Sequence, residues 1–497
     1  MLTYRSGEGS ATNREGFTSI LSFRYEAYMH LRQQDPSLQE PVKLEPARAV
    51  LGYLKRAAGE VNIAHLLLVL FALHLFALSF PSDTSNGGGR VFDEAFYVPT
   101  AQDLLHGVPS NLEHPFFGKV WGALGISIFG DNFFGWRIFY ALIGVASVWV
   151  MYELAKIFYS KEKALFAASM LGFESIFFVH TSLLLLDGPP ILFGLLGFLA
   201  YFKGRQYLSA LAFGLSILSK ETGVFFLLAL GLYHLWASRR SNSFNLRSWR
   251  KIVAFVAIVA IVVGIPLWTY DSAYLPYTSS LVSVQPVVVV NPAANLTITT
   301  TRTTTTHSGY VTNPIQNIQY YFTYQSSLVG CGQVNAWNCY PWSWILPINV
   351  SPLQYFVSTV TVKTSLPNGT VTSQIQYHPI DWQGIGNLVV WYSIWLVVPV
   401  IGWKLLKRKE GEADVLAGCL IAATYLPLFY ISLVSHRVEY AFYFVNTDPG
   451  LALGIPLVTA FLARGSEKGE RRLLLLWVGA AIVFFMFYFP VNPFAFR

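Results

Sequence analysis

Long apolar runs constrain this chain more than any other feature. We expect eleven of them to be membrane-spanning helices. Only helices and closed barrels satisfy their backbone hydrogen bonds in lipid, and apolar runs of about 20 residues favour helices. Charged residues make up only 12% of the chain, against roughly 25% in a soluble domain. The sequence therefore predicts an all-α polytopic membrane protein and excludes a soluble enzyme. The expected spans are 62–80, 137–158, 164–180, 188–202, 206–219, 222–237, 252–270, 386–403, 414–434, 441–462 and 473–490.

Lys and Arg are distributed unevenly between the loops that join these spans. If the N-terminus is cytoplasmic, 26 of the 34 basic residues fall on the cytoplasmic side. Short cytoplasmic loops of membrane proteins carry such an excess. We therefore predict an integral multi-pass protein whose N-terminus is cytoplasmic and whose C-terminus and long loops are extracytoplasmic. The membrane would be the cell membrane, or that of the endoplasmic reticulum in a eukaryote.

The two long outer loops set the predicted organisation. The run 116–129 in the first loop predicts a helix lying on the membrane face, with Pro115 in its first turn. The second loop is rich in Thr, and its apolar and polar residues alternate as they do in strands. This pattern predicts a small β-rich external region. The four expected parts are a cytoplasmic segment at 1–61, a transmembrane module at 62–270 with a first external loop at 81–136, the external region at 271–385, and C-terminal transmembrane helices at 386–497.

The three cysteines are too few for a disulfide framework or a zinc site. Cys331 and Cys339 both lie in the second outer loop, where they either pair or stay as separate thiols. No segment resembles a metal-binding cluster, so we predict no metal and no cofactor.

Charged residues gather on the outer side of the predicted membrane. Asp93 and Glu94 follow the first span by about a dozen residues, and a short segment places His114 close to Lys119. Cations of this kind hold phosphate groups, and a carboxylate can take a proton from an attacking hydroxyl. The pattern predicts an external anion-handling site. As an alternative, Asp93 only caps a helix.

The order of these motifs resembles the protein O-mannosyltransferases, within the polyprenyl-phosphate-dependent (GT-C) glycosyltransferases. The acidic pair Asp93-Glu94 matches that of the family, and His114-Pro-Phe-Phe-Gly-Lys119 agrees with its His-Pro-Pro-Leu-Gly-Lys motif at four of six positions. The resemblance extends from residue 92 to about 455 and implies a GT-C fold with eleven spans. Further similar stretches are Phe129-Gly-Asp-Asn-Phe-Phe-Gly-Trp-Arg137, Leu185-Leu-Asp187, Pro341-Trp-Ser-Trp344 and, loosely, Arg437-Val-Glu-Tyr-Ala-Phe-Tyr443.

The resemblance implies a reaction and a role for each matching residue. Members of the family move mannose from dolichyl-phosphate mannose to Ser or Thr hydroxyls of exported proteins, with inversion and without a metal. Asp93 would be the general base and Glu94 would position the acceptor or Arg137, with the two catalytic roles exchanged as the alternative. Asp187 would cap a helix or contact the acceptor, and Trp342 and Trp344 would belong to an interfacial aromatic belt or, as the alternative, stack on sugar. The residues expected to bind the donor phosphate are Lys119, Arg137, His114, Lys220 and Arg437, with a structural role as the alternative for His114.

Other functions fit parts of the same pattern. A related transferase of the aminoarabinose or arabinose type would use a lipid or glycan acceptor, and a non-catalytic relative would serve as a partner subunit. A transporter would need polar residues near mid-membrane, whereas here they gather at one face. The expected partners are a lipid-linked phosphosugar, an exported protein, the bilayer and a second copy or related chain. No nucleic acid is expected, because the basic residues lie at the ends of the spans.

Overall fold

The computed structural model describes most of the chain beyond residue 61. The described residues are 62–81, 89–107, 111–241, 246–273, 277–278, 281–282, 304–305, 310–311, 314–329, 339–346, 353–358, 360–365, 371–377 and 379–491. The chain divides into two units, 1–61 and 62–497, and every described residue belongs to the second. The segment predicted to be cytoplasmic, 1–61, and Cys331 lie outside the described residues.

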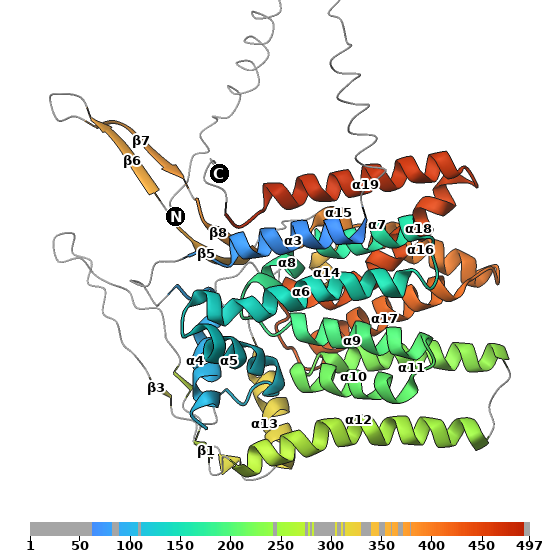
Figure 1. Cartoon of the computed structure of the whole chain (residues 1–497), viewed down its shortest axis with the longest axis horizontal. Helices are drawn as coiled ribbons and strands as arrows, with labels where there is room; N and C mark the ends of the chain where they lie inside the picture. The colour runs from blue at the N-terminus through green and yellow to red at the C-terminus, as the bar shows by residue number, and fades with distance from the viewer. Residues whose placement is uncertain are drawn as a thin grey trace, which may run out of the picture. The chain divides into compact units, whose positions relative to one another are not determined.

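Helices dominate the described part, and each of the eleven predicted spans coincides with a helix or a broken helix. In Figure 1 the long helices lie side by side in nearly the same direction. The helices that match the predicted spans are α3 (Ile63–Ala77), α6 (Phe133–Ala155), α7 (Lys161–Gly172), α8 (Ser175–Ser182), α9 (Gly188–Phe202), α10 (Gln206–Ser219), α11 (Gly223–Ser241), α12 (Leu246–Ala273), α15 (Leu388–Trp391), α16 (Ile394–Leu406), α17 (Glu412–Val434), the 3₁₀ helix η4 (Ala441–Thr447), α18 (Asp448–Ala463) and α19 (Glu467–Phe487).

Fewer of these helices are long enough to cross a bilayer unaided. Among the described residues, five segments are sufficiently long and apolar, and α7 with α8 makes a sixth if this pair, bent by 64°, is one span. The helices α3, α9 and α10 are apolar but shorter. The chain is therefore a membrane-embedded helical protein, and the count of eleven spans stays a prediction. The five segments are Phe133–Ala155, Arg250–Asp271, Leu388–Leu406, Glu412–Val434 and Ala441–Ala463.

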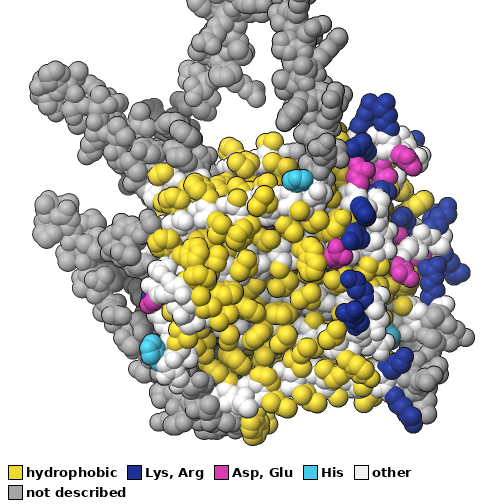
Figure 2. Space-filling view, viewed as in Figure 1, with side chains coloured by type: hydrophobic (Ala, Val, Ile, Leu, Met, Phe, Trp, Pro, Cys, Tyr) yellow, Lys and Arg dark blue, Asp and Glu magenta, His cyan; other side chains and the backbone are white. Residues whose placement is uncertain are grey.

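The surface separates apolar from basic side chains. Figure 2 shows a broad hydrophobic face, with Lys and Arg gathered along one edge where helices end. We call this edge the basic end and the opposite end of the helices the site end. Exposed basic residues of the connecting turns include Lys161, Lys203, Arg205, Arg240, Lys407, Arg408, Arg464 and Lys468. These are residues that the sequence assigns to cytoplasmic loops.

Short elements cover the site end. The helices are α4 (Glu94–Leu105), α5 (Phe117–Phe129), α13 (Pro314–Ser327) and α14 (Pro341–Trp344). Four antiparallel pairs join β1 (Tyr277–Thr278) to β4 (Tyr310–Val311), β2 (Leu281–Val282) to β3 (Thr304–Thr305), β5 (Leu353–Val357) to β8 (Asp381–Gly384) and β6 (Val360–Ser365) to β7 (Val371–Tyr377). The helix α13 was not expected in the region predicted to be β-rich.

Two glycines of α5 bring its backbone against other helices. A Cβ at Gly118 would lie 2.4 Å from the carbonyl oxygen of Ser219, and one at Gly125 would lie 1.9 Å from that of Gly135. Neither position therefore accepts a side chain without movement of the backbone. The glycines let α5 pack on α6 and α10. The helix begins at Phe117, so Pro115 precedes it and the predicted place of Pro115 in the first turn is wrong.

Candidate functional site

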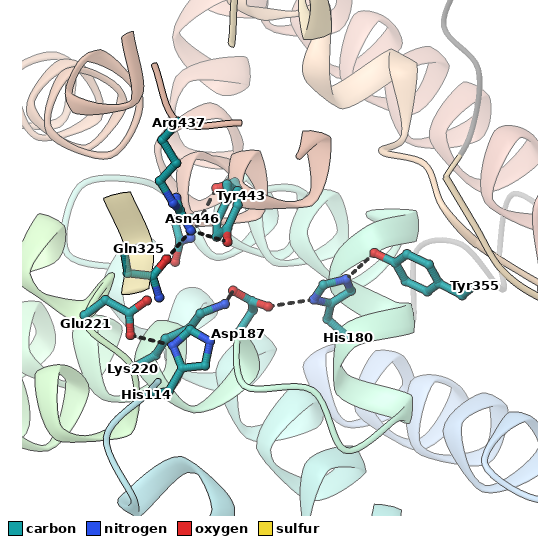
Figure 3. Close-up of polar contacts among 10 residues, drawn as sticks. All are labelled: His114, His180, Asp187, Lys220, Glu221, Gln325, Tyr355, Arg437, Tyr443 and Asn446. Carbon is teal, nitrogen blue, oxygen red and sulfur yellow. Dashed lines mark hydrogen bonds and ion pairs between the residues drawn. The ribbon is translucent and has the colours of Figure 1, made fainter. Parts of the chain in front are cut away.

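Polar side chains from distant parts of the sequence meet at the site end. Figure 3 shows a chain of contacts that runs from Tyr355 through His180 and Asp187 to Lys220. His180 Nε2 lies 2.8 Å from the Tyr355 hydroxyl, and His180 Nδ1 lies 2.9 Å from Asp187 Oδ2. Lys220 Nζ donates to Asp187 Oδ1 at 2.6 Å. Since the Asp187 carboxylate accepts from Nδ1, a neutral His180 ring accepts at Nε2 from the tyrosine hydroxyl.

Asp187 is one member of a buried ion pair. Burial acts to raise the pKa of Asp187, but the Lys220 charge and His180 outweigh it, so the pKa falls below its ordinary value. Burial alone would lower the pKa of Lys220, and Asp187 instead raises it. Asp187 does directly precede α9, but its side chain makes no capping bond. The predicted capping role is therefore wrong.

A second pair lies beside the first. His114 Nδ1 and Glu221 Oε2 are 2.8 Å apart. Burial would raise the pKa of Glu221, but His114 and then Lys220 lower it to about 2. The His114 ring meets Tyr97 edge to face at 6.1 Å. Its other nitrogen, Nε2, makes no hydrogen bond to a described residue and remains available to a ligand.

Arg437 carries the third pair and keeps an unused donor. Its guanidinium donates to Glu439 at 2.7 Å, to the Tyr443 hydroxyl at 3.0 Å and to Gln325. The Tyr443 ring has two cationic neighbours, since Lys220 Nζ and the guanidinium carbon of Arg437 each lie 5.2 Å from its centroid. Within the described part of the chain, Arg437 Nε is buried without a partner and Lys220 Nζ has Asp187 as its one hydrogen-bond acceptor. Both cations can therefore still donate to an anion.

Asp93 lies within reach of the charges of Lys220 and His114 without being bound by either. The carboxylate is half-buried and makes no hydrogen bond or ion pair with any residue that the structure describes. Burial raises the pKa of Asp93 above its ordinary value, although the charges of Lys220 and His114 oppose the shift. Asp93 precedes α4 but makes no capping bond, which argues against the helix-cap alternative.

The residue before Asp93 has an unusual backbone. Phe92 adopts a left-handed φ of 53°, which is uncommon for a non-glycine residue and is often held in place at functional sites. Its ring stacks on that of Tyr355 with centroids 4.1 Å apart. The stack ties the turn that carries Asp93 to strand β5.

Glu94 and Arg137 form a clamp that is closed to ligands. Both side chains are completely buried, with distances of 2.8 Å from Arg137 Nε to Glu94 Oε1 and 2.6 Å from Nη2 to Oε2. The remaining guanidinium donors bind the carbonyl oxygens of Leu78, Phe80 and Gly89. All five donors of Arg137 are thus used. This geometry argues against the predicted phosphate contact and fits the expectation that Glu94 positions Arg137.

Lys119 also binds the protein rather than an open site. Its ammonium donates to the carbonyl oxygens of Asn111 and, at 2.9 Å, of His114, and the side chain is 1% exposed. Burial lowers the pKa of Lys119 to about 7, despite the opposing charge of Glu113. A lysine this buried, with both of its acceptors on the backbone, is poorly placed to bind a phosphate. We therefore assign Lys119 to holding the loop that presents His114.

The two tryptophans differ in their surroundings. Trp344 is 3% exposed and packs against Tyr425 and Phe444, so it does not face lipid as an interfacial belt would. Trp342 is half-buried and stacks on Tyr340 at 4.7 Å. No sugar contact follows from either position.

Several residues of this site were not singled out from the sequence. His180 ends a predicted span just before Leu185-Leu-Asp187, which is the one local signal that pointed to it. Glu221 and Tyr443 lie inside motifs that were noticed for a neighbouring residue. Gln325 and Tyr355 come from the external region, and no sequence pattern marks them. In the described residues no group of three His, Cys, Asp or Glu side chains could hold a metal ion. Cys339 is disulfide-bonded and Cys419 is free.

Comparisons with known proteins agree with this picture. The family model described as dolichyl-phosphate-mannose-protein mannosyltransferase matches residues 113–270. A polyprenol-phosphate-mannose–protein mannosyltransferase of Mycobacterium tuberculosis is 26% identical over 465 residues, which cover 82% of this chain and 84% of that protein. The protein of the same name from Mycolicibacterium smegmatis is 25% identical over 496 residues, with 88% and 90% covered.

A solved structure shares the fold. The protein O-mannosyltransferase Pmt1-Pmt2 complex of S. cerevisiae, bound to the sugar donor, superposes with a TM-score of 0.61 at 13% identity, covering 87% of this chain and 89% of that chain. The chain thus shares the helical membrane fold of that protein. The family match over residues 113–270 and the mycobacterial relatives likewise point to similarity with the protein O-mannosyltransferases.

Proposed function

We propose that this chain is an inverting glycosyltransferase that moves mannose, or a related sugar, from a polyprenyl-phosphate donor to Ser or Thr hydroxyls of exported proteins. The names of the mycobacterial relatives state a polyprenol-phosphate-mannose donor and a protein acceptor. One observation of the site carries the proposal: the Asp93 carboxylate has no partner among the described residues and lies within reach of the charges of Lys220 and His114.

In the proposed reaction Asp93 takes the proton of the acceptor hydroxyl. The hydroxyl oxygen forms a bond to the anomeric carbon on the face opposite the phosphate, and the bond from that carbon to the phosphate oxygen breaks. The polyprenyl phosphate leaves with the electron pair. A single displacement inverts the anomeric centre and needs one base together with stabilisation of the leaving anion.

We propose that Lys220, Arg437 and His114 stabilise that anion. They lie around Tyr443 and Glu221, and each retains at least one N–H donor or ring nitrogen that no described residue engages. Asp187, Glu439 and Glu221 hold these side chains in position. Glu94, Arg137 and Lys119 instead hold the loop that carries Asp93 and His114.

The predicted organisation remains part of the proposal. The module 62–270 carries most of the site, the region 271–385 supplies Gln325 and Tyr355, and eleven helices cross with the N-terminus in the cytoplasm. An impermeant thiol reagent applied to intact cells should label a cysteine placed at Ser326 and not one placed at Lys407. The reverse pattern would overturn the orientation. Assembly into a homo- or heterodimer also remains a prediction.

The direct test is transfer by the purified chain in nanodiscs. We expect sugar to move from polyprenyl-phosphate mannose to a Thr-rich peptide. A panel of other lipid-phosphate sugars would define the donor. Transfer to a lipid or glycan but not to the peptide would favour the aminoarabinose-type alternative, and no transfer with any donor would favour a partner subunit.

Arg437 offers the sharpest test of the phosphate contact. Losing a charged hydrogen bond costs about 1.5–3 kcal/mol, so Arg437→Gln should lower kcat/KM for the donor by about ten- to a hundredfold. The double variant R437Q/E439Q leaves no unpaired buried charge and should show the same loss. Arg471→Met, which breaks an exposed pair with Glu162, is the control and should leave the donor kinetics unchanged. Wild-type kinetics at limiting donor in the double variant would remove Arg437 from the site.

A further inference from the structure

The helix α13 shows the reverse of the burial pattern expected for a helix on the surface of a water-soluble protein. Its buried side carries polar and aromatic residues, and its most exposed side chains include large apolar ones. Ile315 is 65% exposed, Ile318 43% and Phe322 74%. Their spacing of three and then four residues places all three on one stripe of the helix.

The opposite side of α13 is fixed to the protein by polar contacts. Asn317 is 1% exposed and donates to Asp271 of α12 at 2.8 Å. Gln325 accepts from Arg437, and its amide donates to the Glu113 carbonyl oxygen at 3.4 Å. These contacts leave α13 little freedom to turn its apolar stripe inward.

A third face of α13 is exposed and polar. Gln319, Thr323 and Ser326 lie beside the apolar stripe, away from the buried side. A helix with one face on protein, one apolar face and one polar face fits a boundary between lipid and water. In Figure 1 α13 is turned across the direction of the long helices, at their site end.

The neighbouring helix shows which surface the stripe continues. The helix α13 packs on α12, and only 11% of the apolar window in Arg250–Asp271 is buried. Towards the site end, α12 exposes Ile265 at 58% and Trp268 at 57%. These residues belong to a candidate span, so they face lipid. The apolar stripe of α13 extends this lipid-facing surface.

We propose that α13 is an interfacial helix whose stripe of Ile315, Ile318 and Phe322 inserts into the acyl chains of the leaflet at the site end. The bilayer then holds Gln325 against Arg437. On the proposed function, this is the depth at which the phosphate of a lipid-linked donor arrives, so α13 forms a wall of the donor entrance. The membrane contact itself depends only on the surface of the helix.

An environment-sensitive fluorophore can test the contact. Single cysteines at Ile318, Phe322, Gln319 and Thr323, in a Cys419→Ser background, would carry the probe in protein-containing nanodiscs, with Ile265 of α12 as the lipid-exposed reference. We expect probes at 318 and 322 to emit at shorter wavelength and to be quenched by spin-labelled acyl chains, as at 265. Probes at 319 and 323 should be quenched by aqueous iodide.

Other occupants of the stripe give different outcomes. Equal iodide quenching at 322 and 323 would overturn the proposal. Shielding of the probe at 322 that arises only on adding an acceptor peptide would also overturn it, because the occupant would then be a protein. Shielding that arises only at high protein concentration would overturn it too, because the occupant would then be a second copy of the chain. Since the fluorescence does not require catalysis, it stands even if the chain transfers no sugar.

Discussion

Replacing Asp93 by Asn is expected to lower sugar transfer by about 10²–10⁴-fold. Asparagine keeps the shape of the side chain but cannot take the proton of the acceptor hydroxyl. Donor binding should stay near that of the unchanged protein, because Lys220, Arg437 and His114 keep their donors. Single-turnover transfer together with donor binding separates the two effects.

The pH profile sharpens this test. Burial raises the pKa of Asp93, and the base acts only when deprotonated, so activity should rise as the pH rises through that pKa. The D93N variant should lose this limb. If Asp93 were only a helix cap, asparagine would replace it with little loss. A variant that folds, binds donor and transfers at the normal rate would end the catalytic assignment.

Breaking the clamp between Glu94 and Arg137 should have the largest effect on folding. Arg137→Met removes one partner of a completely buried pair, which typically costs about 3–5 kcal/mol because the other charge is left uncompensated. The variant also leaves three carbonyl oxygens without their donor. Thermal or chemical unfolding in detergent would measure the loss.

Two controls show whether the loss comes from the buried charge. The double variant E94Q/R137M removes both charges and should recover part of the stability. Arg471→Met breaks an exposed pair with Glu162, whose side chains are 58% and 49% exposed, and such pairs contribute only about 0–1 kcal/mol. If R137M is no less stable than R471M, the clamp does not hold the fold. If R137M stays folded and instead binds donor poorly, the phosphate role predicted from the sequence returns.

The helices could be predicted from sequence because their signal is local. The spans expected at 188–202 and 206–219 coincide with α9 and α10, where apolar runs end at charged residues or glycine. The same reasoning missed α13. Its apolar residues face outward and its polar residues inward, which is not the usual pattern of a buried helix. The Thr-rich sequence of the external region instead predicted strands.

The sequence singled out Asp93, His114, Lys220 and Arg437, which all lie at the site end. Their roles stay predictions. The role of Asp187 depends on Lys220, 33 residues away, and His180 depends on Tyr355, 175 residues away. Neither contact leaves a local pattern. The sequence also could not show that all five donors of Arg137 are used, because most of their acceptors belong to backbone carbonyl groups, which every residue has.

The pairing of the cations in the site affects how a donor reaches it. Lys220, Arg437 and His114 each lie beside a carboxylate of their own, and Asp93 adds a further negative charge. The cluster as a whole therefore projects little positive potential into water, and it does not draw anions from solution by long-range attraction. Free phosphate and soluble nucleotide sugars gain no advantage in approach. A donor anchored in the bilayer needs none, because diffusion within the leaflet brings its head group to the same depth as the unused donors of Lys220 and Arg437. Confinement to the leaflet thus favours a lipid-linked substrate over a soluble one before any contact with the sugar is made.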